Sequence, residues 1–85
     1  MSHIIAAVST GLSVSAIGII RLSGDGCAGV AGKVFTLNNQ KPLSEAPDKK
    51  LVLGNLHDKD GRIIDSCCAI YSRGPHSYTG EDTVE

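Results

Sequence analysis

Short apolar runs rich in β-branched residues, each ended by a turn signal, constrain the fold of this chain most. They lie at Ile4–Val8, Ile17–Leu22, Leu51–His57 and Arg62–Ser72. Runs of this length and composition predict β-strands. The last two flank Asp58–Gly61 (DKDG), where a glycine can take the positive φ that a short hairpin loop needs. The pattern therefore predicts several short strands, with one hairpin near the middle of the chain.

One helix is predicted after the second run. Ser23–Asp25 offers capping side chains, and apolar residues follow at spacings of three and four, which is typical of a helix with one buried face. Asn38–Lys50 reads as a polar connection, and Thr83–Glu85 begins another strand. This order predicts an α+β fold, a mixed β-sheet with helical cover. The stripe consists of Cys27, Val30, Ala31, Val34 and Phe35.

Composition limits both the core and the partners. The 85 residues include no tryptophan and only 4% aromatics, so we expect an aliphatic core of Ile, Val, Leu and Ala. Such a small core predicts help from a partner subunit or from further chain. A net charge of -1 argues against these residues providing the main contacts to a nucleic acid. Three cysteines, no membrane-spanning run and no signal peptide predict a cytoplasmic protein without a membrane partner.

Gly24–Gly29 (GDGCAG) matches the G-x-G-x-x-G pattern of dinucleotide-binding folds between a strand and a helix. That fold also needs a second parallel strand that ends in an acidic residue about 20 positions further on. The nearest acid is Glu45, which lies in the polar connection. A glycine-rich helix start is therefore the better interpretation.

No catalytic or metal-binding residue is predicted. Cys67 and Cys68 are adjacent in a strand and point to opposite faces, so they cannot share one tetrahedral metal. His3, His57 and His76 are scattered and read as surface residues. The 85 residues contain neither a P-loop motif for GTP nor a G-x-S-x-G nucleophile elbow.

Arg21 is the exception within the second apolar run. A charge there is costly unless it is paired. Two hypotheses stay open on the residues alone: an internal ion pair, for instance with Asp65 or Glu81, or a bond to a polar group of a ligand.

Two segments resemble one family. Residues 17–24 (IGIIRLSG) resemble the "IxIIRISG" strand of the TrmE/MnmE family of tRNA-modification GTPases, and residues 75–85 (PHSYTGEDTVE) resemble its "PxSYTGEDxxE" segment. Residues 53–56 (LGNL) and 60–65 (DGRIID) look like the hairpin of that family, in the same order. The resemblance covers essentially the whole chain, and the second motif is long and unusual.

The resemblance implies that residues 1–85 are the first part of an N-terminal domain, incomplete at its C-terminal end and without the GTPase domain. The fold would be similar to the folate-binding domain of the glycine-cleavage aminomethyltransferase. The domain would dimerise and bind a 5-formyltetrahydrofolate-like donor, with Arg21 and Glu85 at the folate-binding positions. A carboxylate such as Glu85 can accept both the ring N–H and the exocyclic amine of a pterin.

The full protein implied by the resemblance would modify C5 of the wobble uridine in tRNA with a flavin-dependent partner protein, and would hold GTP, Mg²⁺ and K⁺ in the GTPase domain. The chain departs from the family at residues 9–16 (STGLSVSA), where the usual "ATPPGxGG" prolines are missing. The rival hypothesis is a structural or dimerisation module in which Arg21 and Glu85 bind no folate.

Overall fold

A computed structural model of the chain describes residues 3–9 and 17–85 and consists mainly of short β-strands. The departure from the family at residues 9–16 falls almost entirely on residues outside these ranges. In chain order the elements are β1 (Ile5–Val8), β2 (Ile20–Ser23), α1 (Cys27–Ala31), β3 (Phe35–Leu37), the 3-10 turn η1 (Leu43–Glu45), β4 (Leu51–His57), β5 (Ile63–Ser72) and β6 (Thr83–Val84).

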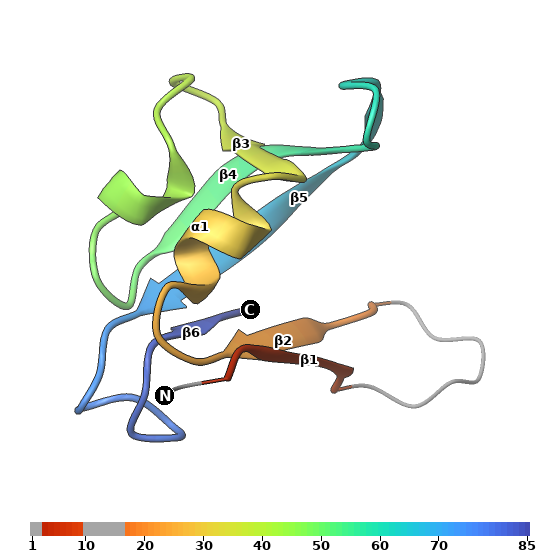
Figure 1. The fold of residues 1–85 in the computed structure, drawn as a ribbon. Coiled ribbons are helices and arrows are strands. Elements are labelled where there is room, and N and C mark those ends of the chain that lie inside the picture. Colours follow the sequence, from red (N-terminus) through yellow and green to blue (C-terminus); the bar gives the residue numbers. More distant parts are fainter. Residues whose placement is uncertain (1–2, 10–16) are drawn as a thin grey trace.

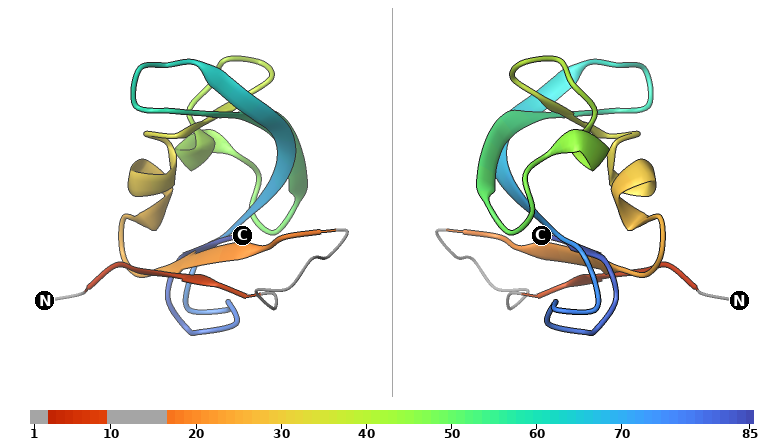
Figure 2. Two further views of the ribbon diagram at one scale, coloured as in Figure 1. Left: turned by 90° about the vertical axis from the view of Figure 1, so that its right-hand side faces the viewer. Right: turned by 90° about the vertical axis from the view of Figure 1, so that its left-hand side faces the viewer.

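The strands form one six-stranded sheet in the order β1-β2-β6-β5-β4-β3. Each pair of neighbouring strands in the described sheet is antiparallel. The sheet curls around α1 and η1, and β5 bends from the β4 side toward β6 (Figure 1 and Figure 2). The last strand in the chain therefore lies in the middle of the sheet, between β2 and β5.

The predicted α+β fold with a mixed sheet and helical cover is wrong. Among the described residues, α1 has five residues and η1 three, so the architecture is nearer to all-β. The helix ends early because Val34 and Phe35 leave the expected stripe and Phe35 begins β3. Val30 and Val34 are 40% and 43% exposed, so neither is on a buried helical face. β-branched and aromatic residues favour the extended chain there.

The start of the helix also differs from the prediction. The N-cap is Gly26, in the left-handed region at φ 81°, and no side chain caps the helix. The chain leaves α1 into β3, which pairs antiparallel with β4. The described sheet has no parallel pair on which a dinucleotide fold could be built, so the glycine-rich helix start is the correct interpretation of Gly24–Gly29.

The prediction of the central hairpin is confirmed. β4 and β5 are joined by a turn in which Gly61 takes φ 84° and its N–H donates to the carbonyl O of Asp58 at 3.0 Å. A carboxylate oxygen of Asp58 also accepts the N–H groups of Asp60 and Arg62, both at 2.9 Å. The turn therefore satisfies its own backbone groups.

The core is only partly the aliphatic one that composition predicts, because it includes two aromatic residues. Both large aromatic members, Phe35 and Tyr71, are buried, at 5% and 8% exposure. The remaining positions are filled mostly by small residues, and Leu43 and Cys27 are fully buried. No isoleucine of the described residues belongs to this core. The buried hydrophobic residues are Cys27, Ala28, Ala31, Phe35, Leu37, Leu43, Ala46, Ala69, Tyr71 and Val84.

Large apolar side chains lie on the outside instead. Ile5, Val8 and Ile20 on the β1–β2 ribbon are 64%, 53% and 58% exposed, so the apolar run at Ile17–Leu22 does not form a strand covered on both faces. Leu51 and Leu53 on β4 are 65% and 60% exposed. Monomeric proteins rarely leave this much aliphatic surface together. No helix in residues 3–9 and 17–85 is long and apolar enough to cross a membrane.

Candidate ligand-binding site

β6 brings together the two residues that the family resemblance singles out. Leu22 of β2 pairs with Val84 of β6, so Arg21 and Glu85 lie across from each other on the next antiparallel step. Glu85 is held from its other side because its backbone N–H and C=O bond to Ile70 at 3.0 and 2.9 Å. Two residues 64 positions apart in the sequence therefore meet on one face of the sheet.

The two side chains form an ion pair. Nη2 of Arg21 donates to Oε2 of Glu85 at 2.7 Å, and the side chains keep 29% and 32% of their surface exposed. This hydrogen bond to Glu85 is the main cause that raises the pKa of Arg21 above its usual value. The partner of Arg21 is therefore Glu85, and not Asp65 or Glu81, which the sequence suggested as examples of an internal partner. The pair by itself fits either hypothesis for Arg21, the structural or the ligand-binding one.

Tyr78 completes the arrangement, which we call the Arg21–Tyr78–Glu85 cluster. Its ring lies over the guanidinium of Arg21, with 4.6 Å from Cζ to the ring centroid. At this distance the ring attracts the cation. Sequence reasoning misses Tyr78 as a site residue; the signal that could have found it is an aromatic residue in a hydrogen-bonding loop after a Gly-Pro break.

The loop that carries Tyr78, residues 73–82, is fastened to the sheet at several points. Oδ1 of Asp82 accepts the N–H of Gly74 at 2.8 Å, and its carbonyl O accepts the N–H of Gly24 at 2.9 Å. The hydroxyls of Thr79 and Ser23 are bonded at 2.9 Å. A cis peptide bond joins Gly74 and Pro75.

The side chains of the cluster can form more hydrogen bonds than the ion pair uses. The pair uses one guanidinium nitrogen and one carboxylate oxygen, whereas Arg carries five N–H donors and a carboxylate has two acceptor oxygens. Nε of Arg21 is buried and has no hydrogen-bond partner within the described part of the chain. Apart from the buried Nε, the cluster can therefore present guanidinium donors of Arg21 and an acceptor of Glu85 side by side to a planar ligand.

Two hollows in the surface lie elsewhere. One of about 180 Å³ is lined by residues of β4 and β5, among them Leu53 and Cys68, and one of about 430 Å³ lies along β3 and the end of β4, near Thr36 and His57. Neither is lined by a cluster residue, so shape alone does not point to the cluster. Its chemistry does, because it gathers two opposite charges and an exposed aromatic ring at one place on the sheet.

The structure also describes the surroundings of three other candidates, His57, Cys67 and Cys68. His57, predicted at the surface, is half-buried, and its Nε2 is bonded to Oγ1 of Thr36 at 3.1 Å. Cys67 is half-buried and Cys68 exposed, on opposite faces as predicted, and burial raises the pKa of the Cys67 thiol. Within residues 3–9 and 17–85 no three His, Cys, Asp or Glu side chains are grouped as metal ligands.

The architecture and the cluster define a small antiparallel β domain with an Arg–Glu pair beneath an aromatic ring. A sequence profile described as "GTP-binding protein TrmE N-terminus" matches residues 4–85. The chain belongs to this family, as its two motifs predict.

Relatives agree over the whole length of the chain. It is similar to proteins named tRNA modification GTPase MnmE from Carboxydothermus hydrogenoformans, 43% identical over 86 residues, and from Finegoldia magna, 39% identical over 85 residues. Each alignment covers 100% of this chain but only 19% and 18% of the relative. A third, from Clostridioides difficile, is 40% identical over 81 residues, which is 95% of this chain and 17% of the relative. The chain thus spans about a fifth of the relatives it matches.

Proposed function

We propose that this chain binds a reduced folate of the 5-formyltetrahydrofolate type through Arg21 and Glu85. The observation that carries the proposal is the 2.7 Å contact between these two side chains, which are 64 residues apart in the sequence. The free oxygen of Glu85 suits the adjacent N–H groups of a pterin edge, and the remaining donors of Arg21 suit a carbonyl or carboxylate of the same ligand.

The wider role is proposed from the relatives. The chain works as one part of a longer cytoplasmic protein that modifies C5 of the wobble uridine of tRNA, together with a flavin-dependent partner protein. GTP, Mg²⁺ and K⁺ act in a separate GTPase domain. The folate-binding part holds the one-carbon donor and takes no part in GTP hydrolysis.

We also propose that the chain forms a homodimer. The exposed isoleucines and valine of the β1–β2 ribbon, and the exposed leucines of β4, are the surfaces that favour association. Sedimentation equilibrium is expected to give twice the chain mass. Ile20→Glu and Leu53→Glu, made separately, identify the surface, because only a charge within the interface returns the protein to a monomer. A wild-type monomer across the concentration range contradicts dimerisation.

The folate proposal is tested by calorimetric titration of 5-formyltetrahydrofolate into the 85-residue chain. Saturable binding is expected. Arg21→Ala and Glu85→Gln are each expected to weaken it about tenfold to a hundredfold, the range for a lost hydrogen bond to a charged group. Arg62→Ala is the matched control because Arg62 is exposed beside the hairpin turn, away from the cluster.

The fold of each variant is checked by its ¹H–¹⁵N spectrum before titration. A folded wild-type chain that binds no folate sinks the proposal. It leaves the second candidate, a dimerisation module in which the Arg21–Glu85 pair only fastens β6 to β2. A folded dimer without folate affinity is the specific result that favours this candidate.

A further inference from the structure

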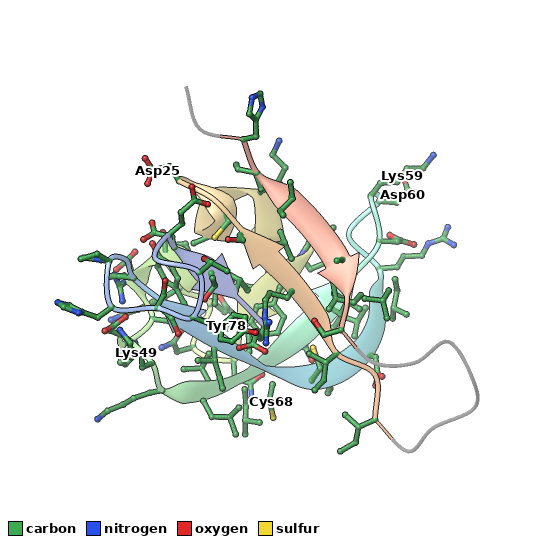
Figure 3. The ribbon with its side chains drawn as sticks, turned by 90° about the horizontal axis from the view of Figure 1, so that it is seen from below. Asp25, Lys49, Lys59, Asp60, Cys68 and Tyr78 are labelled. Atoms are coloured by element: carbon green, nitrogen blue, oxygen red, sulfur yellow. The ribbon has the colours of Figure 1, made fainter. Side chains whose placement is uncertain are left out.

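Tyr78 is unusually exposed for an aromatic residue at a charged site. Its side chain lies in the loop between β5 and β6, and the residue is 82% exposed. Aromatic rings normally bury a large part of their area, which is a main source of stability in small domains. Figure 3 shows Tyr78 in this loop beside the sheet, away from the turn that carries Lys59 and Asp60. Its exposure is therefore not explained by core packing.

The position of the ring comes from the backbone of the loop. The next residue, Thr79, is bonded to Ser23 of β2 at 2.9 Å, and Asp82 ties both Gly74 and Gly24 to the loop. These anchors lie on both sides of residue 78 in the sequence. The loop thus holds the ring over Arg21 while most of its surface remains open to solvent.

From this arrangement we propose that Tyr78 is a positioning residue for the ligand, packing its ring against the flat pteridine of a folate bound by Arg21 and Glu85. The inference rests on the proposed folate-binding function. It gives the ring face of Tyr78 a role that is separate from the hydrogen bonds of Arg21 and Glu85.

The geometry supports stacking. A heterocycle that bonds to the guanidinium edge and to the free carboxylate oxygen lies close to the plane of these two groups. The Tyr78 ring already lies next to the guanidinium, with its centroid 4.6 Å from Cζ of Arg21. Offset aromatic pairs have centroid separations of about 4.5–7 Å. A pteridine beside the guanidinium therefore meets the same ring without a rearrangement of the loop.

A purely structural role for Tyr78 makes a different prediction. If the ring only orients Arg21 through the cation–π contact, the environment of the ring changes little when the ligand binds. Loss of the ring then weakens the binding of any ligand of Arg21, whether or not the ligand contains a pteridine. If the ring stacks on the ligand, the effect depends on the pteridine.

The first test is NMR of the 85-residue chain with labelled tyrosines, titrated with 5-formyltetrahydrofolate. The chain has only two tyrosines, and Tyr71, at 8% exposure in the core, is an internal control. Stacking is expected to move the ring signals of Tyr78 upfield in a saturable manner while those of Tyr71 stay in place.

The second test is calorimetry of Tyr78→Phe and Tyr78→Leu. The phenylalanine variant keeps the ring and is expected to bind within about twofold of wild type. The leucine variant is expected to lose about threefold to tenfold in affinity, the range for an aromatic pair. Titration with p-aminobenzoylglutamate, which lacks the pteridine, is expected to give the same result for the leucine variant and wild type.

The outcomes separate the two proposals. A wild-type chain that binds no folate overturns folate binding and the role of Tyr78 together. Binding that depends on Arg21, with Tyr78 signals unmoved and Tyr78→Leu unchanged in affinity, overturns only the stacking role. If Tyr78→Leu does not fold, the wild-type NMR titration decides the question without a variant: saturable upfield shifts of the Tyr78 ring signals support stacking, and unmoved signals overturn it.

Discussion

Replacing Gly54 with alanine tests the packing of the sheet most directly. Gly54 lies in the middle of β4, between Leu37 of β3 and Cys67 of β5. A Cβ added there would overlap the carbonyl O of Thr36 and lie 2.5 and 2.9 Å from Cζ and Cε1 of Phe35. Carbon atoms in contact normally stay about 3.5–4.0 Å apart. Both the Phe35 ring and the β3 backbone must therefore move, by roughly 1 Å.

The expected cost follows from these contacts. Overpacking a well-packed core costs about 1–3 kcal/mol, and turning a buried ring off its rotamer adds about 0.5–1.5 kcal/mol. Alanine also lowers the conformational entropy of the unfolded chain, which stabilises the folded protein by about 0.4–1 kcal/mol. Because backbone as well as side chain is in the way, we expect a net loss of about 3 kcal/mol. For a domain of this size that corresponds to about 12–24 °C in Tm.

The assay is urea unfolding followed by circular dichroism at one fixed protein concentration. The slope m should be unchanged while the midpoint falls. Gly29→Ala is the matched control because a Cβ there meets nothing within 4 Å, and within α1 it is expected to stabilise by about 0.5–1 kcal/mol. A Gly54→Ala protein as stable as wild type, beside a control that behaves as expected, refutes the close packing of Phe35 on β4.

Two further predictions concern titration and reactivity. The pKa of Asp48 is lowered from 3.8, chiefly because its carboxylate accepts the backbone N–H of Arg73. The contribution of the ionised carboxylate to stability is complete above about pH 4 and is lost as the pH falls through the lowered pKa. In urea midpoints measured against pH, Asp48→Asn should therefore reduce the loss of stability below about pH 4. An unchanged loss in the variant contradicts the assignment. Cys68 is exposed, whereas burial raises the pKa of the Cys27 and Cys67 thiols. Iodoacetamide at about pH 8 should therefore modify Cys68 first, which peptide mass spectrometry detects, and equal rates at all three cysteines would contradict this difference in burial.

Elements that depend on neighbours in the sequence are predictable. β4 has the predicted bounds Leu51–His57 and β5 begins one residue after the predicted start, because strand propensity and the Asp58–Gly61 turn act over a few residues. The opposite exposure of Cys67 and Cys68 follows from the two-residue period of a strand. The two motifs, read as a resemblance, are enough to identify the family, which the profile match establishes.

Elements that depend on distant partners are not predictable in this way. Sequence reasoning misses β3 because Phe35 fits a helical stripe as well as a strand, and only its burial against Gly54 decides between them. The expected aliphatic core is right for alanine, leucine and valine but wrong for isoleucine and the aromatic residues, for the same reason. Composition counts apolar residues, whereas the curl of the sheet determines that alanines and two aromatic residues lie inside and the isoleucines outside.

The candidate site shows this division most clearly. The sequence by itself determined that Arg21 is a charge in an apolar run, and the resemblance predicts that Arg21 and Glu85 belong to one site. Only the tertiary structure decided that the two side chains bond to each other and that Tyr78 lies over them. The physical reason is the insertion of β6 between β2 and β5. It closes a loop of more than sixty residues through pairings that no local pattern encodes.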